Sequence, residues 1–389
     1  MVGHLIRAVV GAWTMTACAL AAGETLSFEK VKLSSDKYEA ASVADLNRDG
    51  KPDIICGAYW YPGPDFKTAH KMCDVLYESE YFDDFSDFPL DVNGDGYDDI
   101  ITGGWFGKTL AWRENPKGGT GEWKVHVIDK PGNIETVRFW DVDGDGVPEI
   151  VPNAADKIIV YKLVRGSDGK GTGKFDKFVL REGGVGHGLG YGDINGDGRG
   201  DFLGVGGWAE QPPEGLEGKW SWHAEWDFKQ TSVPILVHDV DEDGLADLIL
   251  GAGHGYGLWW YKQGKDADGK RTWTKQIIDE KRSQYHDLVL ADIDNDGRPE
   301  LITGKRYRAH NGQDPGANDP VGVYYFKISK GKFERVTIDY GPAETTAGAG
   351  LYLWVADVDG NGWKDIVAPG KGGLYLFKNM GPKAAPSKP

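Results

Sequence analysis

The sequence predicts an all-β protein, a seven-bladed β-propeller with four antiparallel strands in each blade. The first observation is a nine-residue acidic motif, D-x-[DN]-x-[DN]-G-x-x-[DE], whose copies begin at Asp45, Asp91, Asp141, Asp193, Asp239, Asp292 and Asp357. The second is the spacing of these copies, 46 to 65 residues, which is typical of a propeller blade and not of the shorter helical repeats. The third is the short apolar run after each copy, such as DIICGA or DLILGA, which predicts a strand.

The acidic motif has the chemistry of a calcium-binding loop. Ca²⁺ prefers six to eight oxygen ligands, and positions one, three and five of the motif are Asp or Asn in every copy. Position six is always glycine, as at Gly50 and Gly297, because a sharp turn there favours a residue without a Cβ atom. Position nine is Asp or Glu and would complete the ligand shell. We therefore expect up to seven structural calcium ions.

The expected calcium ligands are Asp45, Asn47, Asp49 and Asp53; Asp91, Asn93, Asp95 and Asp99; Asp141, Asp143, Asp145 and Glu149; Asp193, Asn195, Asp197 and Asp201; Asp239, Asp241, Asp243 and Asp247; Asp292, Asp294, Asp296 and Glu300; and Asp357, Asp359, Asn361 and Asp365. An EF-hand is excluded because its loop ends in a bidentate Glu at position twelve. Here that position is Cys56, Thr102, Pro152, Gly204, Leu250, Thr303 or Ala368. Acidic turns without metal would explain one copy but not seven in register.

The strands can be assigned in order within a blade, most clearly in the sixth. An inner strand (HDLVLAD) ends at the acidic loop, and a second (ELITGK), a third (VGVYYFKI) and an outer fourth strand (KFERVTI) follow. The last blade stops after its third strand, GGLYLFKN. The N-terminal segment Ser27–Leu33 (SFEKVKL) alternates like a strand and resembles the outer strand at 332–338. We expect it to complete the last blade and close the ring, which removes the exposed sheet edges.

Two blades carry long insertions. Blade four has a Trp-rich, Pro/Gly-interrupted stretch at 206–226, and blade six has a basic and polar stretch, Lys305–Pro320. Insertions of this length in a compact repeat are often functional.

The first 22 residues have the features of an export signal, with Arg7 followed by an apolar run from Ala8 to Leu20 and small residues up to Ala22. This run is too short to span a membrane, so we expect no transmembrane segment. We expect a secreted or periplasmic protein, with Cys18 leaving lipoprotein anchoring as a lesser alternative. The propeller would occupy residues 24–380 and a tail 381–389. Cys56 and Cys73 could pair within one blade, but the sequence leaves a disulfide open.

The formal net charge is −16, and 24 of the 60 Asp and Glu residues stand at expected calcium-ligand positions. No basic stripe occurs along the chain, so we expect no nucleic-acid partner. The oligomeric state cannot be predicted from this sequence.

Seven acidic loops, each followed by an apolar strand and in most blades by a Gly-Ala or Gly-Gly pair (CGAYW, TGGWF, VGGWA, LGAGH), resemble the FG-GAP/VCBS propellers, the class that includes the integrin α-subunit head. The resemblance covers about residues 27–380. It implies a propeller used for adhesion, carbohydrate binding or catalysis. More loosely, the chain resembles the propeller half of aldos-2-ulose dehydratases, which eliminate water from keto-sugars, but it has no room for their cupin part.

Candidate functional residues gather at the channel mouth opposite the calcium loops. The residues six positions before each loop form a ring: Glu39, Phe85, Glu135, His187, Val233, His286 and Leu351. The turns between second and third strands would add Trp60, Trp105, Trp208, Glu210, His254, Lys305, Arg306, Tyr307, Arg308 and His310 to this face. Aromatic faces with a few polar groups suit a sugar ligand, although each Trp could equally pack between blades.

Two chemistries fit this set of residues. In a β-elimination, His286 or His187 would be the base, Lys305, Arg306 and Arg308 would stabilise the enolate, and Tyr285 or Tyr307 would be the acid. Alternatively, His187, His286, Glu135 and Glu39 could hold one Zn²⁺ or Mn²⁺ that polarises the carbonyl. The sequence thus favours a lyase or dehydratase acting on a keto-sugar or uronide. The alternative is a non-catalytic, adhesion-type propeller that binds carbohydrate or protein.

Overall fold

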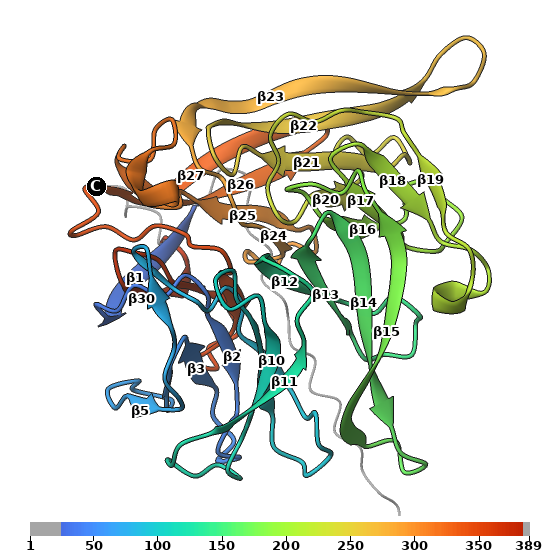
Figure 1. Ribbon diagram of the computed structural model, residues 1–389. Helices are drawn as coiled ribbons and strands as arrows, with labels where there is room; N and C mark the ends of the chain where they lie inside the picture. Colours follow the sequence, from blue (N-terminus) through green and yellow to red (C-terminus); the bar gives the residue numbers. More distant parts are fainter. Residues whose placement is uncertain (1–24, 384–389) are drawn as a thin grey trace, which may run out of the picture.

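Seven four-stranded antiparallel sheets are arranged as propeller blades in the computed structural model, which describes residues 25–383 (Figure 1). This architecture confirms the predicted fold class. The innermost strands of the blades are β2, β8, β12, β16, β20, β24 and β28. Parallel bridges join neighbouring blades at Ala40–Tyr352 and Gly190–Ile235.

The strand bounds follow the predicted order within each blade. Blades one to three are β2 (Ser42–Ala44), β3 (Asp53–Cys56), β4 (Tyr59–Tyr61) and β5 (His70–Lys71); β8 (Phe88–Leu90), β9 (Asp99–Gly103), β10 (Leu110–Glu114) and β11 (Lys124–Asp129); and β12 (Ile134–Trp140), β13 (Glu149–Ala154), β14 (Lys157–Arg165) and β15 (Gly171–Glu182).

Blades four to six are β16 (Gly190–Gly192), β17 (Asp201–Gly204), β18 (Gly207–Glu210) and β19 (Ser221–His223); β20 (Leu236–His238), β21 (Asp247–Gly251), β22 (Tyr256–Lys265) and β23 (Arg271–Ser283); and β24 (Leu288–Ala291), β25 (Glu300–Gly304), β26 (Val321–Ser329) and β27 (Lys332–Gly341). Blade seven is β28 (Trp354–Ala356), β29 (Asp365–Ala368), β30 (Leu374–Pro382) and β1 (Leu26–Ser34). A small hairpin of β6 (Tyr77–Glu78) and β7 (Tyr81–Phe82) and two 3₁₀ turns, η1 (Gly215–Glu217) and η2 (Ala309–Gly312), lie between blade strands.

The two ends of the described chain pair in one blade. Strand β1 runs antiparallel to β30, with Val31 opposite Leu376 and Phe28 opposite Asn379 (Figure 1). The predicted ring closure is therefore confirmed. Strand β30 continues to Pro382, so the described part of the predicted tail extends this strand.

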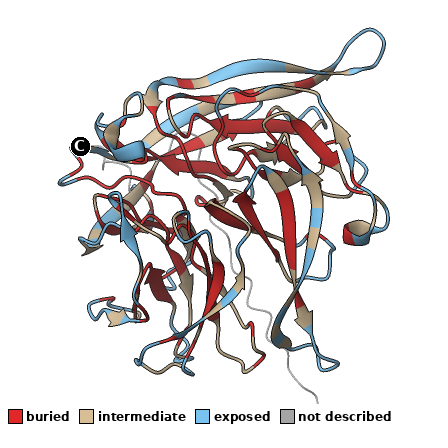
Figure 2. Cartoon of the chain, viewed as in Figure 1, coloured by how far each residue is buried: buried red, intermediate tan, exposed pale blue. Residues whose placement is uncertain are grey.

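The core lies between neighbouring blades. Second strands such as β9 and β21 are buried along their whole length, because both of their faces are covered by adjacent blades. The outer strand β15 alternates between half-buried and exposed positions, since one of its faces meets solvent (Figure 2). This difference explains why second strands read as continuous apolar runs and outer strands as alternating ones.

The loop carboxylate at position nine has a structural role of its own. In every blade it is the first residue of the second strand, and it accepts the backbone N–H of loop residue two, as Asp53 does from Leu46 at 2.9 Å. The other oxygen of Asp53 accepts the N–H of Gly63, beyond the third strand, at 3.0 Å. The glycine at position six has a positive φ, 82° at Gly50 and 86° at Gly297, as expected for the sharp turn.

Cys56 and Cys73 are both buried free thiols, so the structure contains no disulfide between them. Cys56 packs in the apolar cluster shared with blade seven, whereas Cys73 packs in the cluster shared with blade two. The two thiols therefore belong to opposite sides of blade one. The predicted export signal and the Cys18 anchoring alternative lie outside the described residues. No helix within residues 25–383 is long and apolar enough to cross a membrane.

Candidate functional site

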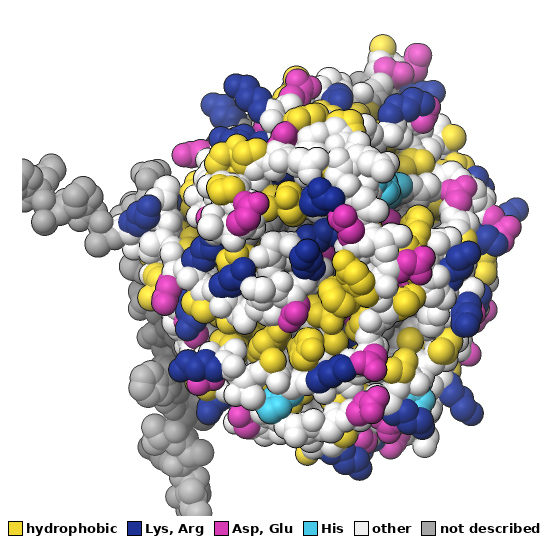
Figure 3. Space-filling view, turned by 60° about the vertical axis from the view of Figure 1, so that its left-hand side comes forward, with side chains coloured by type: hydrophobic (Ala, Val, Ile, Leu, Met, Phe, Trp, Pro, Cys, Tyr) yellow, Lys and Arg dark blue, Asp and Glu magenta, His cyan; other side chains and the backbone are white. Residues whose placement is uncertain are grey.

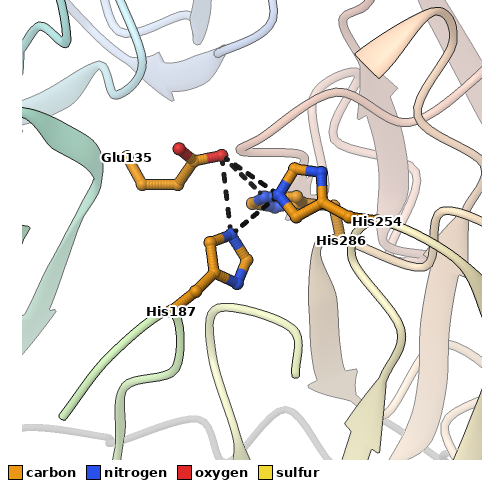
Figure 4. A group of neighbouring side chains, drawn as sticks. All are labelled: Glu135, His187, His254 and His286. Carbon is orange, nitrogen blue, oxygen red and sulfur yellow. Dashed lines mark hydrogen bonds and ion pairs between the residues drawn. The ribbon is translucent and has the colours of Figure 1, made fainter. Parts of the chain in front are cut away.

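Four consecutive blades each contribute one side chain to a cluster at the channel mouth. Glu135 lies on β12 of blade three, and His187 and His286 lie just before the inner strands of blades four and six. His254 comes from the turn between β21 and β22 of blade five. Figure 4 shows all four side chains pointing toward one centre. The ring position therefore brought together three of its predicted residues, and His254 joined them from the predicted turn.

The distances within the cluster are short. Glu135 Oε1 lies 3.0 Å from Nε2 of His286, 3.6 Å from Nε2 of His187 and 3.8 Å from Nε2 of His254 (Figure 4). The Nε2 atoms of His254 and His187 are 3.0 Å apart. One ligand atom from each of the four residues lies within 4.8 Å of all the others.

Burial sets the charge states of the cluster. It lowers the pKa of both His254 and His286 to about 3, and the neighbouring Arg306 charge acts in the same direction. Burial alone would raise the pKa of Glu135, but hydrogen bonds from His187 and His286 and the charge of Arg306 hold it well below its usual range. Neutral imidazoles thus face an ionised carboxylate at neutral pH.

This donor set fits a divalent transition metal. Imidazole nitrogen and carboxylate oxygen are the usual ligands of Zn²⁺ and also suit Mn²⁺, and ligating histidines must be neutral. His254 Nδ1 lies 2.8 Å from Asp314 Oδ2, a contact that directs Nε2 toward the centre, as carboxylates do behind metal-bound histidines. His310 contacts the same carboxylate at 2.9 Å and stacks on the His254 ring at 4.5 Å.

Contrary to the prediction, Glu39 does not join the cluster. It pairs instead with Arg306, whose Nε lies 2.9 Å from Oε1 and whose Nη2 lies 3.3 Å from Oε2. Arg306 Nη1 also lies 3.2 Å from Glu135 Oε1. A buried guanidinium therefore takes both Glu39 oxygens, and His254 stands in the predicted fourth ligand position.

Two hollows adjoin the cluster. One, of about 300 Å³, is lined by Tyr81, Phe85, Trp105, Phe106, Glu135, Arg306 and His310 among others. The other, of about 340 Å³, lies toward blade four and includes Trp105, Glu135 and His187. The Trp105 side chain, 39 % exposed, therefore borders both hollows, and both reach Glu135.

Several residues predicted on this face lie elsewhere. Trp60 and Trp208 are buried between blades, and their rings pack on His70 and His223 at 4.8 and 4.2 Å. Glu210 lies beside the acidic loop of blade four, with Oε1 3.3 Å from Asn195 Nδ2. These three residues are therefore not available to a ligand at the channel mouth.

Most of the residues predicted to act as the acid or to stabilise charge also lie away from the cluster, with Arg306 as the exception. Tyr285 is fully buried and donates its hydroxyl to Asp279 at 3.0 Å, so it does not face the cluster. Lys305 is buried, which lowers its pKa to about 8, and Nζ lies 3.4 Å from the carbonyl oxygens of Arg306 and Ala317. Arg308 forms an ion pair with Glu80 at 3.0 Å, and Tyr307 is half-buried beside it in sequence. The insertion thus contributes Arg306, His310 and Asp314 to the site.

On the face shown in Figure 3, Lys and Arg side chains are scattered among Asp and Glu and do not form a stripe.

The FG-GAP-like repeat family matches residues 91–151 and 239–303, and the FG-GAP repeat family matches residues 38–69. Among solved structures, the exotype rhamnogalacturonan lyase YesX is 12 % identical, with 93 % of this chain and 75 % of that chain covered and a TM-score of 0.51. An Agrocybe aegerita lectin that recognises non-reducing terminal N-acetylglucosamine is 16 % identical, with 80 % and 81 % covered and a TM-score of 0.46.

No curated protein sequence matches the chain. At these identities the similarity to solved structures establishes the fold alone. The matched repeats and the seven sheets together show that the chain is a seven-bladed β-propeller with FG-GAP and FG-GAP-like repeats, consistent with the FG-GAP propeller family.

Proposed function

We propose that the protein acts on carbohydrate at the channel mouth, as a metal-dependent lyase or dehydratase that removes a proton beside a carbonyl or carboxylate group. The observation that carries this proposal is the cluster of Glu135 with three histidines, in which Glu135 lines both hollows and His187 lines one of them. A packed repeat has no structural need for two imidazoles with their Nε2 atoms 3.0 Å apart beside a carboxylate.

Trp105 supports a sugar as the ligand. Its exposed ring lies between two hollows of about 300 and 340 Å³, which is within the range of small-molecule sites. An aromatic ring can stack on the apolar face of a pyranose, while polar groups such as Glu135 and His310 hold its hydroxyls. A sugar chain stacked on Trp105 would place neighbouring units in the two hollows and the bond between them near Glu135.

The three less exposed residues, Glu135, His254 and His286, are the proposed ligands of the divalent metal, which when bound would stabilise negative charge on the substrate oxygen. Three protein ligands with an open position are typical of a catalytic metal site. His187 is the most exposed imidazole of the cluster, with 31 % of its side chain accessible. We assign it the role of the base that takes the proton from carbon, and its imidazolium can return that proton to the departing oxygen.

The test uses uronides and keto-sugars, with the appearance of an unsaturated product as the readout and metal content measured in parallel. We expect His187→Ala to abolish product formation while the metal and the melting temperature are retained. His254→Ala should lose the metal. His126→Ala, on the outer strand β11, is the matched control and should change neither product formation nor metal content. A wild-type protein that binds these sugars and forms no product would identify a binding propeller and contradict the lyase proposal.

We also propose that the acidic loops bind structural calcium. In blade six, for example, the loop carboxylates of Asp292, Asp294 and Glu300 lie within 4.8 Å of one another. Calcium binding would relieve the repulsion between these carboxylates, so it contributes to folding free energy. A chelator should therefore lower the melting temperature, and an unchanged melt would argue against structural calcium.

A further inference from the structure

One residue near the end of the third strand has an equivalent position in every blade, and in four blades it is a lysine that reaches the acidic loop. The second residue of every second strand pairs with a third-strand residue, as Ile150 does with Tyr161 and Leu248 with Tyr261. The next residue along the third strand is therefore structurally equivalent in all blades. In chain order it is Pro62, Glu114, Lys162, Glu210, Lys262, Lys327 and Lys378.

The residue type at this third-strand position correlates with the residue type at position three of the loop in the same blade. Where the third strand supplies Lys, position three is Asp: the residues are Asp143, Asp241, Asp294 and Asp359. Where it supplies Pro or Glu, position three is Asn: the residues are Asn47, Asn93 and Asn195. Every loop that has Asp instead of Asn at position three therefore also has a lysine ammonium group on the third strand of its blade.

In blades three and five the lysine bridges two expected calcium ligands. Lys162 Nζ contacts the carboxylate of Asp143, lies 2.7 Å from Asp145 Oδ2, and is 3.8 Å from Glu149 Oε1. Lys262 Nζ likewise contacts Asp241 and lies 2.9 Å from Asp243 Oδ2. The ammonium group therefore lies between the carboxylates of positions three and five, where a calcium ion would need the same oxygens.

The lysines of blades six and seven approach their loops differently. Lys327 Nζ lies 3.0 Å from Asp294 Oδ2 and Lys378 Nζ 3.9 Å from Asp359 Oδ2, both at position three. In blade six the position-five carboxylate of Asp296 pairs instead with Arg298. Neither lysine forms an ion pair with the position-five residue of its loop, and Arg298, whose side chain is 57 % exposed, can release Asp296 to a calcium ion.

We propose that Lys162 and Lys262 are built-in cations that take the place of calcium in the loops of blades three and five. Calcium is then confined to the other five loops. The physical reason is that an ammonium and a divalent cation bound to the same two carboxylates would repel each other at a few ångströms. The inference rests on the proposed calcium role of the remaining loops.

Native mass spectrometry in the presence of CaCl₂ tests this assignment, because the mass of each bound calcium separates it from a channel transition metal. The wild type should bind five calcium ions, because two of the seven loops are already neutralised by Lys162 and Lys262. Lys162→Met and Lys262→Met should each gain one ion, and the double variant two. Lys327→Met is the matched control and should leave the count unchanged.

A wild-type count of seven would overturn the lysine assignment while leaving the calcium role intact. A folded Lys162→Met variant with an unchanged count would overturn it as well. A wild-type count of zero would instead remove the calcium role itself. Because the wild-type count needs no substitution, the result does not depend on whether a variant folds.

Discussion

Arg138 on β12 joins blade three to three other blades across the channel. Its guanidinium lies 2.7 Å from Asp287 Oδ1 in blade six and 3.3 Å from the Leu351 carbonyl oxygen of blade seven, and it also donates to the Val233 carbonyl before blade five. It lies 4.5 Å from the ring centre of Tyr352. Both charged side chains of this ion pair are buried.

Replacing Arg138 by Met should destabilise the propeller strongly. The Asp287 carboxylate would keep only uncharged partners, the backbone N–H groups of Leu353, at 2.6 Å, and of Leu288. Removing one partner of a buried ion pair typically lowers the free energy of unfolding by about 3–5 kcal/mol. For the roughly 360 described residues, an unfolding entropy of about 2.1 cal/mol/K per residue converts this loss to a fall of about 4–7 °C in melting temperature.

The assay is thermal unfolding of Arg138→Met, Asp287→Asn and the double variant. The double variant should be more stable than the sum of the two single effects predicts, because it no longer buries an unpaired carboxylate. Burial already raises the pKa of Asp287, so the loss in Arg138→Met should shrink at lower pH as the carboxyl protonates. Additive effects of the two substitutions would refute the proposed coupling.

Two further predictions concern stability. Deleting residues 24–36, which removes β1, should lower the melting temperature sharply because blade seven loses its outer strand; an unchanged melt would reject ring closure by this strand. With a chelator present, lowering the pH from 8 to 6.5 should raise the melting temperature. Burial raises the pKa of the position-nine carboxyls to about 6 or 7. Near these pH values the folded chain binds protons that the unfolded chain does not, and this proton binding stabilises the folded state. The stabilisation is lost as the pH rises through about 6 to 7. His254 and His286 act in the opposite direction: their pKa values are lowered in the folded chain, so protonation destabilises it, but this effect grows only below about pH 6.5. A melting temperature that falls between pH 8 and pH 6.5 would contradict the reasoning.

The repeat made the fold predictable because seven copies of one loop define where each inner strand ends. The same spacing placed Glu135, His187 and His286 correctly, since an offset of six residues keeps the same position in every blade. It failed for Trp60 and Trp208 because the turns before them are only two residues long, Gly57–Ala58 and Val205–Gly206. Both tryptophans are therefore already in the third strand, opposite Ile55 and Leu203, and face the blade interface.

Other parts of the site depend on contacts that no repeat encodes. Strict alternation would direct Glu135 and Arg138 to opposite sides of β12, but the pairing with β13 is irregular between Ile134 and Val137, and both reach the channel. The role of Asp314 depends on the blade-six insertion folding against the blade-five turn that carries His254. Only the length of the insertion and its excess of polar groups pointed to this segment.

The lysine assignment makes a prediction about the candidate site. Blades three and five, which hold Glu135 and His254, are the blades whose loops we infer to be neutralised by lysine. One strand connects the site residue to the loop in each of these blades: β12 runs from Glu135 toward Asp141, and β21 runs from Asp247 toward His254. Hydrogen exchange in a chelator should therefore show early loss of protection in β2 and β3 of blade one and in β16 and β17 of blade four.

Under the same conditions β12, β13, β20 and β21 should remain protected, because the ammonium groups of Lys162 and Lys262 still balance their loop carboxylates. Local opening of this kind follows the local free energy, so the order of exchange reports which loops depend on calcium. In Lys162→Met the protection of β12 and β13 should fall to the level of blade four. Uniform loss of protection in all blades of the wild type would show that lysine does not replace calcium, and that the strands holding Glu135 and His254 depend on the metal as much as the others do.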